Sequence, residues 1–375
     1  MEVYPMDPRI EKLAKTLIRY STRIQAGDRV WIEATNGGRD LVKALVRETY
    51  AAGGAPFVRL NDHEIDRELL LGCTDEQLRL RAESDIMLMH SMQATISFTA
   101  VRNDSELADV PAEQMSRLAR LYDDPIFEAI QKNGVRWCVL RYPTPAMAQA
   151  AQMSMEAFED FFYRVCTMDY ARMDAAMNPL KALLERTDRV RIVGPGTDLR
   201  FSIQGLPAIK CAGDCNIPDG EIYSAPVRDS VEGVITYNAP SIQDGFTFEN
   251  VRLTFERGRI VRAEANDTAR VNKLFDMDDG ARYVGEFALG VNPFITKPMR
   301  NTLFDEKIAG SFHFTPGMSY DDCFNGNRSA LHWDLVCIQT PEYGGGEIYF
   351  DDVLVRRDGR FVLPELACLN PENLK

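Results

Sequence analysis

The spacing of apolar residues changes near residue 188 of this 375-residue chain, and this change constrains the fold more than any other feature. Before it, segments with helical spacing, such as residues 9–20, alternate with short apolar runs such as residues 29–34. That alternation predicts a mainly parallel sheet covered by helices. After it, short strands follow one another with turn signals between them. We therefore predict an α/β domain at residues 1–188 and a β-rich α+β domain at residues 189–375.

The patterns of several segments predict individual strands and helices. The run Asp-Ile-Met-Leu-Met-His at residues 85–90 is typical of a third strand in the parallel sheet. Residues 153–186 are predicted to form a further long helical region. In the second domain one helix is expected near residues 267–275. The run Ser-Ala-Leu-His-Trp-Asp-Leu-Val-Cys-Ile, which ends at residue 338, predicts a buried strand.

Charge and composition exclude several classes of partner. The net charge of -13 argues against a nucleic-acid partner and against binding to anionic membranes. No run has the length and uniform apolarity of a transmembrane helix, and the acidic N-terminus lacks the features of a signal peptide. Most of the eight cysteines lie in apolar runs, as expected of reduced thiols, and Cys211 and Cys215 lack a second pair at zinc-finger spacing. A cytoplasmic protein is therefore expected.

The second domain carries a set of residues that suits metal binding. His332 and Asp334 lie two apart, so on a strand their side chains point to the same face. His313 precedes them, and Glu221 and Glu286 lie in otherwise apolar runs, where a carboxylate is costly unless a cation pairs with it. Two imidazoles and three carboxylates that converge would suit one or two divalent metal ions. The domain is therefore predicted to carry a metal site.

Each of these residues also has an ordinary structural interpretation. Either histidine could be a core residue with a backbone partner, and each glutamate could be half of a buried ion pair. Glycines and prolines flank nearly every candidate. They strengthen the interpretation as a metal site, because they allow sharp turns and close backbone approach. Among metalloenzymes, His313, His332 and Asp334 alone would form the facial triad of a mononuclear non-haem Fe(II) oxygenase. A non-catalytic metal-binding or peptide-binding protein is the third possibility.

Four blocks of the second domain resemble successive blocks of the thermophilic aminopeptidase family, peptidase family M29. They are Asn-Ile-Pro-Asp-Gly-Glu-Ile-Tyr-Ser-Ala-Pro from residue 216, Gly-Glu-Phe-Ala-Leu-Gly-Val-Asn from 285, Phe-His-Phe-Thr-Pro-Gly-Met-Ser-Tyr from 312, and Asn-Arg-Ser-Ala-Leu-His-Trp-Asp-Leu-Val from 327. Shorter matches in the first half, such as Gly-Gly-Ala-Pro-Phe-Val from residue 53, extend the resemblance over most of the chain.

The resemblance implies a two-metal aminopeptidase that acts on peptides with a free N-terminus and forms homodimers. The implied metal ligands are Glu221, Glu286, His313, His332 and Asp334, and the implied catalytic residues are Tyr320 and Glu286. The ions would be divalent, with zinc expected first and cobalt, manganese or magnesium as alternatives. The connection from His313 to His332 is shorter than in better-known members, so a loop near the site is expected to be trimmed. Ring-cleaving dioxygenases of dihydroxypyridines resemble the same family, but they would not need both glutamates as ligands.

Overall fold

The computed structural model describes residues 6–243 and 245–375. The chain divides into two compact units, one formed by Met1–Thr167 with Gly213–Ile217 and the other by Met168–Ala212 with Pro218–Lys375. The boundary expected at residue 188 differs from this division, because helix α9 (Tyr170–Leu184) contacts strands β7 and β9 of the second unit. Within that unit the Tyr170 hydroxyl accepts a hydrogen bond from the backbone N–H of Asp219, at 3.2 Å.

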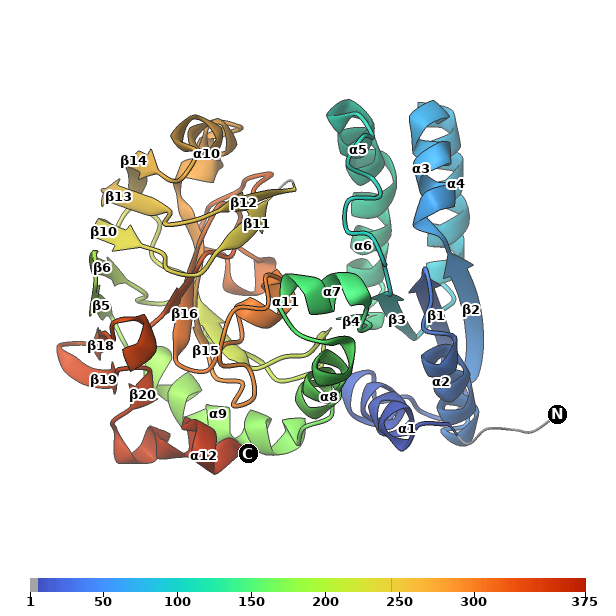
Figure 1. Cartoon of the computed structure of the whole chain (residues 1–375), viewed down its shortest axis with the longest axis horizontal. Helices are drawn as coiled ribbons and strands as arrows, with labels where there is room; N and C mark the ends of the chain where they lie inside the picture. Colours follow the sequence, from blue (N-terminus) through green and yellow to red (C-terminus); the bar gives the residue numbers. More distant parts are fainter. Residues whose placement is uncertain (1–5, 244) are drawn as a thin grey trace. The chain divides into compact units, whose positions relative to one another are not determined.

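The first unit is built on a five-stranded sheet in the order β2-β1-β3-β4-β8, in which all neighbouring strands are parallel. Figure 1 shows helices α3 to α6 gathered above this sheet and α1 and α2 below it in that view. The elements of this unit are α1 (Pro8–Lys15), a π-helical turn (Thr16–Ser21), β1 (Arg29–Thr35), α2 (Arg39–Ala51), β2 (Ala55–Asn61), α3 (His63–Gly72), α4 (Asp75–Met89), β3 (Ala94–Thr99), α5 (Ala112–Leu118), a second π-helical turn (Ala119–Asp123), α6 (Asp124–Lys132), β4 (Arg136–Arg141), α7 (Pro145–Ala150), α8 (Met155–Cys166) and β8 (Asn216–Ile217).

One local prediction in the first half is wrong. Residues 85–90 form the end of helix α4 and the residue after it instead of a strand, and the third strand of the sheet is Ala94–Thr99. Helix α4 begins at a capping box, in which Thr74 and Gln77 exchange side-chain and backbone hydrogen bonds and fix the helical start. The helical region predicted at residues 153–186 is confirmed, and it consists of two helices because Asp169 accepts a hydrogen bond from the N–H of Arg172 and caps a new helix.

The second unit contains an eight-stranded antiparallel sheet in the order β14-β13-β10-β6-β5-β18-β19-β20 and a five-stranded one in the order β17-β16-β15-β9-β7. Its elements are α9, β5 (Arg189–Gly194), β6 (Thr197–Ser202), β7 (Ile209–Cys211), β9 (Glu221–Ser224), β10 (Glu232–Thr236), β11 (Ser241–Gln243), β12 (Phe246–Phe248), β13 (Arg252–Glu256), β14 (Arg259–Glu264), α10 (Thr268–Phe275), β15 (Val284–Gly290), α11 (Thr302–Asp305), β16 (Ser311–Pro316), β17 (Val336–Ile338), β18 (Glu347–Phe350), β19 (Val353–Arg357), β20 (Arg360–Phe361), α12 (Pro371–Leu374) and four 3₁₀ turns (Asp279–Arg282, Asp321–Cys323, Pro341–Tyr343, Pro364–Leu369).

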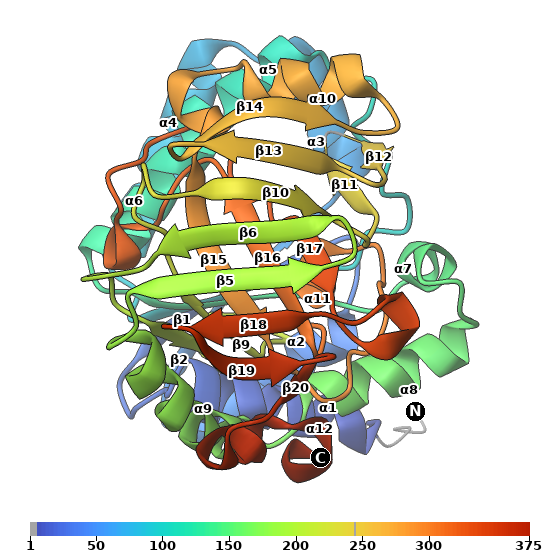
Figure 2. The same cartoon turned by 90° about the vertical axis from the view of Figure 1, so that its left-hand side faces the viewer.

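Aromatic side chains join these two sheets. Figure 2 shows the eight strands in front of β15 and β16. Phe201 of β6 lies 5.0 Å from Phe287 of β15 and 4.9 Å from Phe314 of β16, measured between ring centroids. Each such aromatic pair adds about 0.5–1.5 kcal/mol beyond the burial of its area. The smaller sheet therefore has one face fixed against a phenylalanine core, which holds β15 and β16 rigidly in place.

The buried strand expected to end at residue 338 is shorter than predicted, since only Val336–Ile338 pair as a strand. Residues 331–335 belong to no regular strand, but backbone hydrogen bonds join them to residues 314–318, and Gly317 and His332 form an isolated bridge. Trp333 anchors this stretch. Its indole N–H donates to the Ser241 hydroxyl at 2.9 Å, and its ring packs 5.0 Å from that of Phe248. The predicted fold class is nevertheless confirmed, because a parallel α/β sheet precedes a β-rich α+β region.

Two further features are the character of the helices and the state of the cysteines. None of the helices that the structure describes has both the length and the apolar character needed to cross a bilayer. All eight cysteines are among the described residues, and each is a free thiol.

Candidate metal centre

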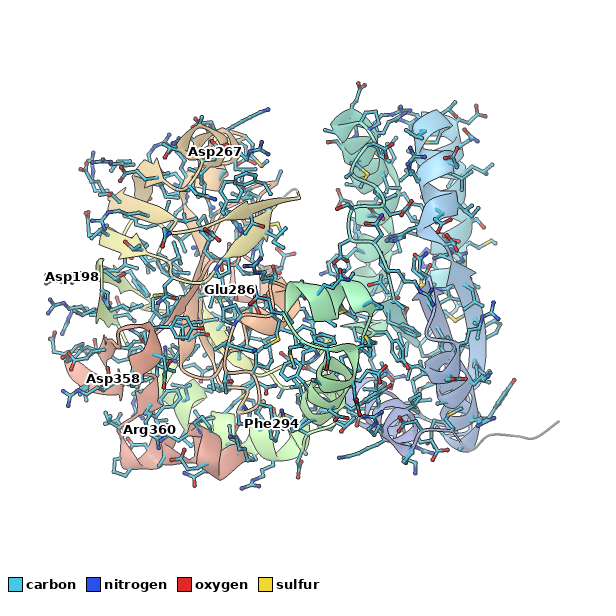
Figure 3. All side chains as sticks on the ribbon, in the orientation of Figure 1. Asp198, Asp267, Glu286, Phe294, Asp358 and Arg360 are labelled. Carbon is cyan, nitrogen blue, oxygen red and sulfur yellow. The ribbon has the colours of Figure 1, made fainter. Side chains whose placement is uncertain are left out.

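The five predicted ligands meet in the second unit. Glu221 begins strand β9, Glu286 lies within β15, and His313 lies within β16, and these three strands are neighbours in the smaller sheet. His332 and Asp334 come from the anchored stretch before β17. Glu286 is 3% exposed and His313 is 0% exposed, so the centre is buried. In Figure 3, Glu286 is labelled inside the second unit, whereas Asp198 and Asp358 are at its outer surface.

The side chains form two clusters that share Glu286. Cluster A consists of Glu221, Glu286 and His313, and cluster B of Glu286, His332 and Asp334. In each cluster one possible ligand atom per residue lies within 4.8 Å of the others. Glu286 Oε1 is 2.9 Å from His313 Nε2, and its Oε2 is 3.7 Å from His332 Nε2. The two carboxylate oxygens of Glu286 therefore face different histidines.

The remaining distances complete the two clusters. Glu221 Oε2 lies 3.4 Å from His313 Nε2, and Asp334 Oδ1 lies 3.3 Å from His332 Nε2. Glu221 Oε2 is buried without a hydrogen-bond partner among the described residues. An unpartnered buried carboxylate oxygen is costly in a protein interior, and a cation beside it removes that cost. The geometry therefore fits a bound cation in cluster A.

Cluster B has outer hydrogen bonds that fix its ligands. His332 Nδ1 lies 2.8 Å from the carbonyl oxygen of Met318, and because a carbonyl only accepts, Nδ1 carries the proton. This leaves Nε2 free to bind a metal ion. The Thr315 hydroxyl donates to Asp334 Oδ1 at 2.8 Å. Gly317, at φ +107°, brings its backbone close to the segment with His332, since a Cβ there would meet the Leu331 carbonyl oxygen at 2.0 Å.

A buried lysine that the sequence analysis missed lies beside cluster A. The ammonium of Lys307 is 2.6 Å from Glu221 Oε1, 2.7 Å from Glu306 Oε1 and 3.5 Å from Asp219 Oδ1. Burial disfavours its charge, but the carboxylates outweigh this effect and hold the pKa of Lys307 well above its usual value. Cys211, Asp219 and Glu221 form a third group with metal-ligand spacing, and Lys307 occupies it. The only signal in the sequence was the run Asp-Glu-Lys at residues 305–307 between apolar residues.

The pKa shifts show how the metal-free protein balances the negative charge of the carboxylates in the two clusters. Burial disfavours the imidazolium form of both histidines, but nearby carboxylates outweigh it. Glu221 and Glu286 raise the pKa of His313 to about 9, and Asp334 and Glu286 raise the pKa of His332 to about 10. Burial raises the pKa of Glu286. For Asp334, both histidines overcome the effect of burial and lower the pKa well below its usual range.

The charge of the centre fits divalent metal ions. Five buried or nearly buried carboxylates surround it, and the ammonium of Lys307 neutralises one of them; they are Asp219, Glu221, Glu286, Glu306 and Asp334. Nitrogen and oxygen donors of this kind suit zinc, and also manganese or cobalt. Without metal, protons on the two histidines supply part of the missing positive charge.

Tyr320 lies at the edge of the centre. Its ring is 4.6 Å from that of His332 between centroids, and the residue is 43% exposed. Burial of the phenol group and the charges of Asp334 and Glu286 raise its pKa well above the usual value. The hydroxyl therefore remains protonated at neutral pH and able to donate a hydrogen bond.

The comparison with known proteins identifies the family. The model of the thermophilic metalloprotease family M29 matches residues 6–361. The chain belongs to this family. Membership makes it a metal-dependent hydrolase, and it confirms the family predicted from the four sequence blocks. Aminopeptidase T of Thermus thermophilus is 28% identical and aligns with 94% of this chain and 98% of its own, and aminopeptidase AmpS of Bacillus subtilis is 25% identical, with 88% and 90% covered.

Two solved structures share the fold of this chain. Wild-type AmpT from Thermus thermophilus matches with a TM-score of 0.79 at 25% identity, covering 96% of this chain and 100% of its own. A 2,5-dihydroxypyridine dioxygenase from Pseudomonas putida KT2440 matches with a TM-score of 0.63 at 15% identity, covering 97% and 100%. The dioxygenase thus shares the fold, and at this identity the likeness carries no information on the reaction.

The raised pKa values predict how the stability of the metal-free protein depends on pH. A histidine whose pKa is higher in the folded than in the unfolded state stabilises the fold fully below the unfolded value of about 6.5. That contribution is lost as the pH rises through the folded values, about 9 for His313 and about 10 for His332. The melting temperature of the metal-free protein should therefore fall between about pH 7 and pH 10.

Thermal unfolding in the presence of a chelator measures this effect, with two variants as comparisons. His332→Gln should flatten the fall, whereas replacement of the exposed His90 in the first unit, as His90→Gln, should leave it unchanged. A His332→Gln protein with the same pH dependence as the unsubstituted one would refute the interpretation.

Proposed function

We propose that this chain is an aminopeptidase that removes N-terminal residues from peptides by means of two divalent ions. The observation that carries the proposal is the arrangement of Glu286, whose two oxygens face His313 and His332 separately. Glu221, Glu286 and His313 would hold one ion, and Glu286, His332 and Asp334 would hold the other. The names of the aminopeptidase relatives support the substrate class, and zinc is the ion expected first.

The bound ions would supply an activated water and polarise the carbonyl of the scissile bond. The residues of the chain have the other roles. Glu286 lies between the two histidines, where its carboxylate would help to hold the ions and orient the water that attacks the scissile bond. The protonated phenol of Tyr320 can donate to the oxyanion that develops on the carbonyl. An aminopeptidase must also bind the free amine of its substrate, and a metal ion or an acidic side chain can do this.

The alternative function is a mononuclear Fe(II) dioxygenase that uses His313, His332 and Asp334. The reason to consider it is the residue set, because two histidines and one carboxylate form the facial triad that suits a non-haem Fe(II) oxygenase. The geometry favours the peptidase, because His313 is grouped with Glu221 and Glu286, and His332 with Glu286 and Asp334. A single iron held by both histidines would leave the buried Glu221 Oε2 without a partner.

The first prediction from this proposal concerns metal content. The protein should bind two divalent ions per chain, and Glu286→Gln should weaken the binding of both, because Glu286 belongs to both clusters. Activity on aminoacyl-p-nitroanilides should fall at least about a hundredfold with the loss of a metal ligand. Elemental analysis and the nitroanilide assay measure the two effects. Asp198→Asn removes an exposed carboxylate and should change neither.

One metal result would overturn the peptidase proposal in favour of the alternative. A single iron per chain, with metal content unchanged by Glu286→Gln, would fit the dioxygenase and not two ions that share Glu286. Cleavage of a dihydroxypyridine by the iron-loaded protein would complete that case.

Tyr320→Phe tests the proposed oxyanion donor. The change should lower kcat by about a hundredfold or more, the effect of removing one such donor. KM and metal content should change little, because the contact forms mainly in the transition state. Steady-state kinetics on the best peptide substrate measures both constants, and Tyr50→Phe, at an exposed site of the first unit, is the control. If Tyr320 only packs against His332, the Phe variant should keep its turnover.

We also propose a cytoplasmic location and a homodimeric assembly for this chain. Eight free thiols and the absence of a spanning helix among the described residues are compatible with the cytoplasm. A homodimer is expected by analogy with the family. Light scattering at micromolar concentration should give twice the chain mass of 42.3 kDa, and a stable species at the monomer mass would contradict this expectation.

A further inference from the structure

Lys307 is an unusual feature of this centre, because a buried ammonium lies next to a site that must bind other cations. Its side chain is 1% exposed and contacts three carboxylates. It follows α11 in the chain, and its backbone carbonyl accepts a hydrogen bond from the N–H of Asn292 at 3.0 Å. The position of the ammonium is therefore determined by both backbone and side-chain contacts. A fixed positive charge here acts on any ion that binds nearby.

The charge affects the two clusters unequally. Glu221 of cluster A contacts the ammonium through Oε1, which leaves only Oε2 facing His313. In cluster B, Asp334 accepts a hydrogen bond from the neutral Thr315 hydroxyl.

The histidines show the same difference. His332 Nδ1 is held by the Met318 carbonyl oxygen, whereas His313 Nδ1 is buried and has no hydrogen-bond partner among the described residues. An outer hydrogen bond orients a histidine ligand and raises its basicity, and its loss typically weakens metal binding by about 10–100-fold. Cluster A therefore has both a competing cation and a less well supported histidine.

We propose that Lys307 is a built-in cation that lowers the affinity of cluster A for its divalent ion, so that cluster B fills first. The inference rests on the proposed two-ion function. Cluster B then holds its ion tightly, while cluster A fills only when free divalent ion is plentiful. Activity follows the filling of cluster A, so the free metal concentration regulates the enzyme through Lys307.

Titration of the metal-free protein with Co²⁺, followed by visible absorption and by calorimetry, tests the proposal. Wild type should show two binding steps. Glu221→Gln should weaken the later step and Asp334→Asn the earlier one, which assigns the steps to clusters A and B.

Lys307→Met should tighten the later step at least tenfold and leave the earlier step within about threefold. Lys307→Gln removes the charge but keeps a hydrogen-bond donor to Glu221, and it should tighten the same step; it also serves if the methionine variant does not fold. Lys307→Arg retains a positive charge and should leave the later step weak. Lys273→Met, at an exposed site on α10, should match wild type.

The outcomes separate the inference from the function on which it rests. If Lys307→Gln and Lys307→Met fold but bind the later ion no more tightly than wild type, the role of Lys307 is refuted while the two-ion site stands. If wild type and both variants bind a single ion, the two-ion site is refuted, and the inference falls with it.

Discussion

The structure of the second unit depends on the concentration of like charge in its interior. Carboxylates that would repel one another lie within hydrogen-bond distance of two histidines and one lysine. Such an arrangement is stable only when cations balance it, because an isolated buried charge costs several kcal/mol even after relaxation. The phenylalanine core behind β15 and β16 and the backbone pairing of these two strands stabilise the arrangement of the carboxylates. The fold therefore creates a demand for positive charge that metal ions can meet.

Much of this centre could be predicted from the sequence. Glu221, Glu286, His313, His332 and Asp334 were recognisable because each is a polar residue in an apolar setting with glycine or proline nearby. Their convergence follows from the order β9-β15-β16-β17 of neighbouring strands. The closeness of His332 and Asp334 was expected from strand alternation. It holds because backbone hydrogen bonds to residues 314–318 keep the stretch on a strand-like course, although it is not assigned as a regular strand.

Lys307 shows why the rest could not be predicted. Its three carboxylate partners are Asp219 just before β9, Glu221 at the start of β9, and the preceding residue, Glu306. Only the pairing of β9 with β15 and the return of the chain after α11 bring them together. A charge run such as Asp-Glu-Lys is usually exposed, so its local sequence points away from burial. The mistaken strand at residues 85–90 has a related cause. Its apolar residues satisfy either period, and the cap at Thr74, eleven residues earlier, determines the helix.

The anchoring of Trp333 has a consequence for how enzymes of this shape can diversify. The indole N–H of Trp333 donates a hydrogen bond to Ser241 on one side of the segment. On the other side, the bridge between Gly317 and His332 holds the backbone of the segment. Both flanking metal-ligand candidates are thus positioned by contacts outside residues 321–330. Insertions or deletions within residues 321–330 can change the surroundings of the centre without moving His332 or Asp334. Substrate choice can then change over evolutionary time while the inorganic chemistry stays constant.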